Sequence, residues 1–172
     1  MMQPISFRLA TELDLPAIMT IVADARVYLR EKNVPQWQGV YPTEAVFQAD
    51  IKKGALWVAV LNQKIALIMT LSPGPDPNYT IIHGKWLQST DNYLAIHRIA
   101  VARDAAGNGV AQAALEFASQ FARTQSYPSL RFDTHELNAG MRYLAEKNNF
   151  TYCGRVAMAD HTPRFAYELL LS

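Results

Sequence analysis

Hydrophobic residues recur with two different periods over the first 71 positions. Alternation of apolar and polar side chains in "ISFRLA" (residues 5–10) predicts a first strand. Beyond Asp14, which we expect to act as the cap, an apolar stripe at helical spacing predicts a long helix. A shorter helix is predicted over residues 43–54, and two β-rich runs within residues 55–71 predict a hairpin that turns at residues 62–63.

Strands and helices alternate in the second part of the chain. The expected order is a strand over 92–101, a turn with two glycines, a helix from 108 to about 126, a strand over 130–135, a helix over 138–148 and a hairpin turning at 160–163. A strand–helix–strand connection of this length joins parallel strands, so the glycine turn follows the carboxyl end of its strand. Open α/β sheets bind their ligands at that end.

Two stretches show no period. Residues 33–42, "NVPQWQGVYP", are broken by two prolines and a glycine, and residues 72–91 carry three prolines within "SPGPDP". Structureless segments as long as the second stretch are uncommon inside compact domains. We therefore expect residues 72–91 to form a long loop or a functional lid.

Composition limits the class of protein. Half of the 172 residues are hydrophobic, which suits one compact domain over residues 1–172. Because 16 basic residues face 15 acidic ones, we expect neither nucleic acid nor a membrane surface as partner, but a small ligand. Cys153 is alone and the start lacks the order of a secretory signal, so we expect a cytoplasmic protein.

Metal and nucleophile chemistry are not expected. The four histidines show no ligand spacing, a single cysteine builds no thiolate cluster, and no Gly-x-Ser-x-Gly elbow occurs. Cys153 is interpreted as a small core residue. We therefore expect no metal.

The turn "ARDAAGNGVA" (residues 102–111) precedes the third predicted helix. A turn of small residues at a helix N-terminus presents backbone N–H groups and the positive end of the helix dipole, a combination that binds phosphate. A tight turn that needs positive φ at its glycines is the alternative. The dinucleotide fingerprint would need glycine where Gln112 stands, and no Gly-Lys-Ser/Thr loop occurs, which disfavours NAD and ATP.

The run "IAVARDAAGNGVAQAALEFA" (residues 99–118) resembles the acetyl-CoA-binding segment of the GNAT superfamily of N-acetyltransferases. That segment has the pattern Arg/Gln-x-x-Gly-x-Gly/Ala after a strand that ends in valine. Gly109 and Ala111 match the pattern, whereas Ala106 replaces the basic or amide residue. Loss of a charge-assisted contact at Ala106 is expected to weaken cofactor binding somewhat.

A second segment, "NAGMRYLAEKNNF" (residues 138–150), resembles the family's helix that begins with asparagine and is followed by a Gly-Phe pair. Asn138 and Phe150 match, and Asn149 replaces the glycine, as asparagine tolerates the left-handed conformation at a helix end. The resemblance implies an α/β fold of GNAT type, with a mixed, mostly antiparallel central sheet, a parallel β-α-β unit at the cofactor site and helices on both faces.

The resemblance also implies acetyl-CoA as co-substrate. The pyrophosphate is then expected on backbone amides of the glycine turn and the pantetheine arm along the preceding strand edge. The implied cofactor-binding residues are Ile99, Ala100, Val101, Ala106, Gly107, Asn108, Gly109, Val110, Ala111 and Asn138.

A tyrosine that protonates the departing thiolate often stands seven residues after the family's asparagine, and this chain has Ala145 there. Tyr143 points about 160° away from that helix face and is interpreted as a packing residue. A thiol with a pKa near ~8.5 is a fair leaving group, so loss of an acid slows the reaction without forbidding it.

His97 is the candidate base. Period-two alternation puts it on one strand face with Ile99 and Val101, and an ordinary imidazole titrates near neutrality. A hydrogen-bonded core histidine is the alternative. Asp133 and His135 share a face at the end of the neighbouring strand, where they bind a cationic amine, relay a proton, or fix the strand to the following helix.

The resemblance implies that the acceptor enters between residues 33–42 and 72–91. There Trp37, Tyr41 and Trp86 are expected to form an aromatic wall or to serve as packing anchors. A small-molecule amine and a peptide N-terminus both stay open. We predict an N-acetyltransferase that works by direct attack. A non-catalytic acyl-CoA-binding module and a protein-binding adaptor are the alternatives, and a homodimer stays open.

Overall fold

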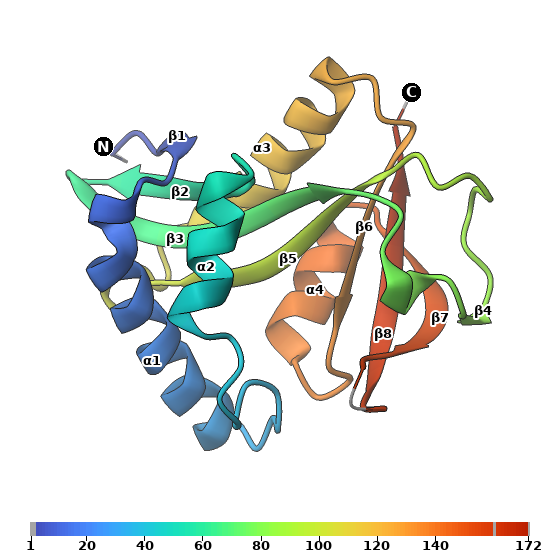
Figure 1. Ribbon diagram of the computed structural model, residues 1–172, viewed down its shortest axis with the longest axis horizontal. Helices are drawn as coiled ribbons and strands as arrows, with labels where there is room; N and C mark the ends of the chain where they lie inside the picture. Colours follow the sequence, from blue (N-terminus) through green and yellow to red (C-terminus); the bar gives the residue numbers. More distant parts are fainter. Residues whose placement is uncertain (1–2, 160, 172) are drawn as a thin grey trace. The chain divides into compact units, whose positions relative to one another are not determined.

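The protein, described here as a computed structural model over residues 3–159 and 161–171, contains two compact units (Figure 1). The first unit consists of residues up to Leu71 together with Arg98–Ala114. The second consists of Ser72–His97 and Leu115–Ser172. Strand β5 (Leu94–Val101) and helix α3 (Val110–Thr124) contribute residues to both units.

Strands β1 (Ser6–Leu9), β2 (Leu56–Leu61) and β3 (Lys64–Pro73) of the first unit pair in antiparallel order. The β2–β3 turn consists of Asn62 and Gln63, with φ values of 53° and 65°. Two consecutive left-handed residues match the right-handed twist of the flanking strands in a two-residue hairpin. The predicted hairpin is therefore confirmed.

Helix α1 (Leu15–Glu31) buries one apolar stripe, as its spacing predicts. Asp14 precedes the helix, but its carboxylate makes no capping bond to α1. It accepts two hydrogen bonds from Arg8, at 2.8 and 2.9 Å, and one from the backbone N–H of Thr11. The guanidinium of Arg8 and these hydrogen bonds hold the pKa of Asp14 below its usual value. The carboxylate of the expected cap thus binds Arg8 of β1 and Thr11 instead of the α1 backbone.

Helix α2 (Glu44–Lys52) begins where the sequence predicts it. The Thr43 hydroxyl accepts a hydrogen bond from the N–H of Val46, and Gly54 ends the segment with a φ of 66°. Figure 1 shows α2 passing in front of β2 and β3, with α1 beside it. Phe47 and Asp50 are the buried residues of α2.

The second unit contains β6 (Ser129–Thr134), α4 (Ala139–Lys147), β7 (Thr151–Ala157) and β8 (Pro163–Leu170). The closing hairpin is confirmed in β7 and β8, although Asp160 of its predicted turn lies outside the described residues. The strand order is β1-β2-β3-β5-β6-β8-β7-β4. Strands β5 and β6 are parallel, whereas β6–β8, β7–β8 and β4–β7 are antiparallel, as in the first unit. This arrangement confirms the predicted mixed, mostly antiparallel sheet.

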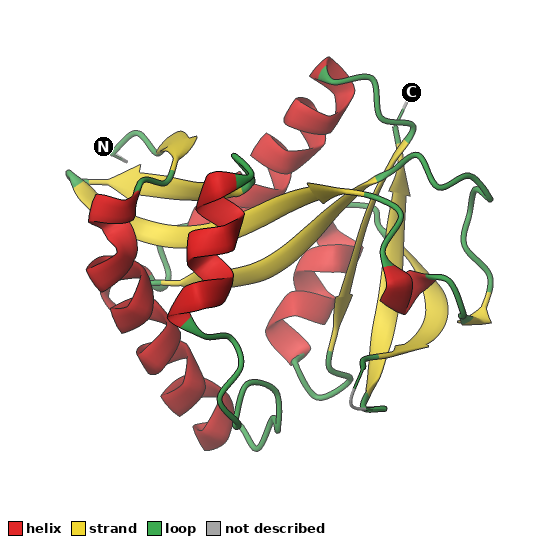
Figure 2. Cartoon of the chain, viewed as in Figure 1, coloured by secondary structure: helices red, strands yellow, loops and turns green. Residues whose placement is uncertain are grey.

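The aperiodic segment 72–91 is mostly loop, with the short helix η2 (Pro77–Tyr79) and strand β4 (His83–Gly84) (Figure 2). Tyr79 and Trp86 pack into the core of the second unit together with Tyr93. None of the helices in the described part of the chain is long and apolar enough to cross a membrane.

Candidate active site

The glycine turn lies in the first unit, between the short helix η3 (Arg103–Ala105) and α3. Gly107 and Gly109 have φ values of 83° and 73°, so the conformational reason for glycine is present. A Cβ added at either position would meet no heavy atom within 4 Å. The glycines therefore face open space, as a turn that admits a ligand to the backbone requires.

The side chain of Asn108 forms hydrogen bonds inside the glycine turn. Its side-chain Nδ2 donates to the carbonyl oxygens of Ala105, at 3.0 Å, and Ala106, at 3.3 Å. These bonds occupy carbonyl groups that would otherwise repel an anion. The arrangement leaves an exposed loop of small residues ahead of the α3 N-terminus, whose dipole favours negative charge.

Strand β5 does not keep a strict two-residue period. Arg98 has a φ of 48°, which interrupts the extended backbone between His97 and Ile99. The prediction that His97, Ile99 and Val101 share one face assumed that side chains alternate without interruption along the strand. That assumption is wrong. The sequence pattern did not predict the left-handed conformation of Arg98, because that conformation does not change which positions of the strand are hydrophobic.

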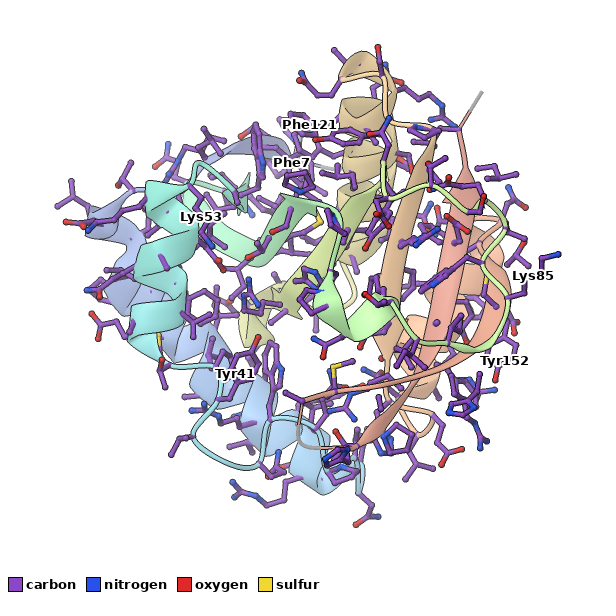
Figure 3. The ribbon with its side chains drawn as sticks, turned by 45° about the vertical axis from the view of Figure 1, so that its right-hand side comes forward. Phe7, Tyr41, Lys53, Lys85, Phe121 and Tyr152 are labelled. Atoms are coloured by element: carbon purple, nitrogen blue, oxygen red, sulfur yellow. The ribbon has the colours of Figure 1, made fainter. Side chains whose placement is uncertain are left out.

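The Arg98 side chain is fixed by acceptors within the first unit. Its Nε and Nη2 donate to the two carboxylate oxygens of Asp50, at 2.8 and 2.9 Å. Its Nη1 donates to the Tyr41 hydroxyl at 2.8 Å, and Thr70 donates to Asp50 at 2.9 Å. This bidentate pair joins β5 to α2. Arg98 also holds Tyr41, which Figure 3 labels on the loop that follows α1.

The backbone of the loop over residues 33–42 is organised by Arg26 of α1. The Arg26 guanidinium donates to the carbonyl oxygens of Trp37, Val40 and Pro42, at 3.1, 2.9 and 2.9 Å. Trp37 is half-buried and Tyr41 is 48% exposed. Tyr41 is thus a partly open aromatic ring of this loop, and its hydroxyl is held by Arg98.

A cluster of polar side chains occupies the second unit. Nε2 of His97 lies 2.9 Å from Oδ2 of Asp76, and the Tyr79 hydroxyl donates to Oδ2 of Asp133 at 2.6 Å. The ring centroids of Tyr79 and His97 are 6.0 Å apart. Two of the predicted residues, His97 and Asp133, therefore belong to one cluster. Asp76 and Tyr79 were missed, because their segment carries no periodic or motif signal.

Burial dominates the electrostatics of this cluster. It raises the pKa of Asp133, and the hydrogen bond from Tyr79 and the charges of His97 and Arg164 oppose that rise in part. The pKa of the Tyr79 phenol is raised well above its usual value by burial and by the Asp133 charge. Tyr79 is therefore a hydrogen-bond donor to the carboxyl group and a poor acid at neutral pH.

His135 lies in the turn between β6 and α4. Its Nδ1 accepts a hydrogen bond from the backbone N–H of Leu137 at 3.1 Å, the contact expected if His135 fixes the strand to the helix. Burial lowers the pKa of His135, and the charge of Arg164 adds to that effect. Asn138 caps α4, with its Oδ1 accepting from the N–H of Met141 at 3.3 Å.

Ala145 is fully buried, so the face of α4 that would carry the family's tyrosine is packed against the protein. Tyr143 is 63% exposed, and its interpretation as a packing residue is wrong. Its ring points away from the buried face, as the helical angle indicates, and is exposed to solvent there.

Trp86 is engaged in packing. Its ring lies over the Arg131 guanidinium at 4.1 Å, and Tyr93 lies at 4.1 Å from the same group. Arg131 in turn forms a buried ion pair with Glu168 at 2.7 Å. Trp86 Nε1 also donates to the carbonyl oxygen of Tyr79 at 3.0 Å. These contacts favour the packing role for Trp86 over a place in an acceptor wall.

No group of three histidine, cysteine, aspartate or glutamate side chains within residues 3–159 and 161–171 is arranged to hold a metal ion. Cys153 is buried, and burial raises its pKa to about 11, with the charge of Glu168 adding to the effect.

Comparison with known proteins identifies the fold. A model of the acetyltransferase (GNAT) family matches residues 26–150. The crystal structure of a GNAT-family acetyltransferase from Streptococcus agalactiae has a TM-score of 0.90 and 30% identity, covering 100% of this chain and 98% of that one. A putative acetyltransferase from Staphylococcus aureus has a TM-score of 0.74 and 22% identity, covering 96% of this chain and 99% of that one.

The ribosomal-protein-S18-alanine N-acetyltransferase from Escherichia coli shares the fold, with a TM-score of 0.68 and 16% identity over 98% of this chain and 95% of that one. Among curated proteins, none matches the chain.

The fold defines the chain as an acyltransferase. It belongs to the acetyltransferase (GNAT) family, which confirms the resemblance carried by its two sequence motifs. Members of this family use acetyl-CoA as the acetyl donor.

Proposed function

We propose that this enzyme transfers the acetyl group of acetyl-CoA to a primary amine of a small molecule or peptide by direct attack. The observation that carries the proposal is the pairing of His97 with Asp76 inside a partly buried polar cluster. An imidazole supported by a carboxylate suits the removal of a proton from an ammonium group. We further propose that residues 1–172 act as one catalytic domain, since the Streptococcus agalactiae enzyme matches the whole chain.

The proposed acetyl-CoA site is the glycine turn with the strand before it. The turn fits a pyrophosphate, because Gly107 and Gly109 face open space ahead of a helix N-terminus. Backbone amides supply most of the proposed contacts, so the change to Ala106 weakens the site without removing it. The proposed contact residues are Ile99, Ala100, Val101, Ala106, Gly107, Asn108, Gly109, Val110, Ala111 and Asn138.

The proposed reaction begins when His97 takes a proton from the ammonium form of the acceptor. The neutral amine then attacks the thioester carbonyl carbon and the new C–N bond forms. The C–S bond breaks and CoA leaves with the electron pair, while the acylated nitrogen gives up its second proton to water, so that a neutral amide is released. Because Ala145 offers no acid, the thiolate departs unassisted or takes its proton from water. Asp133 adds negative charge that favours a cationic acceptor and the imidazolium, and His135 orders the adjoining turn.

Trp37 and Tyr41 are proposed to contact the acceptor, since their loop is held in place by Arg26 and Tyr41 leaves about half of its side chain open. The single cysteine suits a reducing compartment, and we propose a cytoplasmic location. We propose acetyl-CoA and the amine as the partners, without nucleic acid or membrane, and leave the homodimer open.

Binding and turnover test this proposal separately. Thermal denaturation with acetyl-CoA should raise the melting temperature, and a panel of small amines and peptides should release CoA thiol and gain one acetyl group by mass spectrometry. Stabilisation without turnover on a broad panel would favour the non-catalytic acyl-CoA-binding module, which the loss of the tyrosine at Ala145 keeps as the second candidate. Absence of any effect of acetyl-CoA would contradict both.

A further inference from the structure

We propose that Asp76 is a positioning residue of the reaction, which holds His97 through Nε2 and directs Nδ1 toward the proton of the acceptor. This inference rests on the proposed function and assigns a role to the segment 72–91. The Nε2–Oδ2 distance is 2.9 Å, and the two side chains are 19% and 15% exposed. Nδ1 has no hydrogen-bond partner in the described part of the chain.

The second nitrogen of an imidazole is set by the bond that the first one makes. With Nε2–H donating to the carboxylate, the neutral ring carries its lone pair on Nδ1. That atom accepts the proton, and the imidazolium then formed stays paired with Asp76. Because both side chains are largely removed from water, the pair is screened less than a surface pair.

Asp76 is itself held on both sides. Its Oδ1 accepts a hydrogen bond from the N–H of Asn78 at 2.8 Å and so caps η2, while its own N–H donates to the Tyr93 hydroxyl at 2.6 Å. Gly74 donates from its N–H to the carbonyl oxygen of Tyr93 at 2.8 Å. A Cβ at Gly74 would lie 2.5 Å from the Tyr93 ring, so only glycine lets the segment lie this close.

Four other titratable groups belong to this cluster. Tyr79 belongs to η2, Tyr93 directly precedes β5, Asp133 belongs to β6 and Arg164 to β8. Tyr79 donates to Asp133, which leaves Asp76 as the carboxylate in direct contact with His97. Removal of the Asp76 carboxylate should therefore take away the group that fixes the tautomer of His97.

The test compares Asp76→Asn with Glu12→Gln, an exposed carboxylate far from this segment in the chain. In Asp76→Asn, kcat/KM should fall by about tenfold or more. The KM for acetyl-CoA should not change. Glu12→Gln should leave the rate as in wild type. Asp76→Glu, which keeps a carboxylate, should restore most of the rate.

NMR spectroscopy of the His97 ring nitrogens decides the question independently of turnover. In wild type Nε2 should carry the proton of the neutral ring, and Asp76→Asn should mix the two tautomers. The same tautomer in both proteins would overturn the role of Asp76, whether or not any amine is acetylated. If Asp76→Asn does not fold, the same comparison with Asp76→Glu applies, where an unchanged Nε2–H tautomer supports the proposal and a mixture overturns it. Failure of every amine in wild type, with the NMR result as expected, would instead contradict the proposed function.

Discussion

The Tyr79 hydroxyl donates a 2.6 Å hydrogen bond to Oδ2 of Asp133, between a residue of segment 72–91 and one of strand β6. Tyr79 is 3% exposed, and burial raises the pKa values of both groups. A carboxyl group in such a place is costly when ionised. Asp133 is therefore a residue whose charge costs stability at neutral pH.

Asp133→Asn should stabilise the protein at neutral pH, because the amide oxygen still accepts from Tyr79 and carries no charge. The folded-state pKa of Asp133 lies above its unfolded value, so the stability that it contributes is present below about pH 3.9 and declines as pH rises through the folded-state pKa. The melting temperature should exceed that of wild type by about 2–4 °C at pH 7. That difference should shrink toward pH 4.

The exposed Asp104 supplies the control for net charge, since Asp104→Asn should show no such pH dependence. A lower melting temperature for Asp133→Asn at every pH would show that the carboxylate stabilises the fold. Acetyl transfer by the variant should be slower than in wild type if Asp133 supports the imidazolium of His97.

Gly109→Val should weaken acetyl-CoA binding by about tenfold or more, because a branched side chain fills the open space before the α3 N-terminus. The positive φ of 73° adds strain of about 1–2 kcal/mol. Gly54→Val is the matched control, since Gly54 has a φ of 66°, also faces open space and lies outside the glycine turn. Isothermal titration should show normal affinity in Gly54→Val, and equal affinity in both variants would contradict the assignment of the turn.

Asp50→Asn should destabilise the first unit, because it leaves the largely buried Arg98 guanidinium without its bidentate partner. Breaking a buried pair by removing one partner costs about 3–5 kcal/mol. Urea unfolding measures this free energy directly. The exposed pair of Lys64 and Asp104, 4.0 Å apart, should contribute nothing measurable, so equal effects of Asp50→Asn and Asp104→Asn would contradict the account of Arg98.

Cys153 should not react with thiol reagents at pH 8, since a pKa of about 11 leaves on the order of 0.1% thiolate and the side chain is buried. Incubation of the folded protein with a chromogenic disulfide should give no colour until denaturant is added. Rapid colour in the native state would show that Cys153 is accessible, and Cys153→Ser protein would then be needed in every thiol-release assay.

Local signals were sufficient for much of the fold. The hairpin turning at Asn62 and Gln63 and the start of a short helix at Thr43 were predicted, because each depends on residues a few positions apart. The parallel pairing of β5 and β6 followed from the length of their connection, and the two motifs led to the family.

Contacts between residues far apart in the chain could not be predicted from the sequence. Asp76 reaches His97 across 21 positions and Tyr79 reaches Asp133 across 54, from a segment without any period. The left-handed Arg98 broke the alternation on which the shared face of His97 and Ile99 depended. Trp86, expected in an acceptor wall, packs on Arg131 instead, a contact between a loop residue and strand β6 that no local pattern encodes.

The pH dependence of acetyl transfer in wild type and His97→Gln tests the central claim most directly. Glutamine keeps much of the volume and some hydrogen bonding of histidine but has no titratable base. We predict that kcat/KM falls by about 10²-fold or more, that acetyl-CoA affinity is unchanged, and that the acidic limb of the rate profile disappears. A His97→Gln enzyme that keeps both the wild-type rate and the acidic limb would contradict the role of His97 as the base.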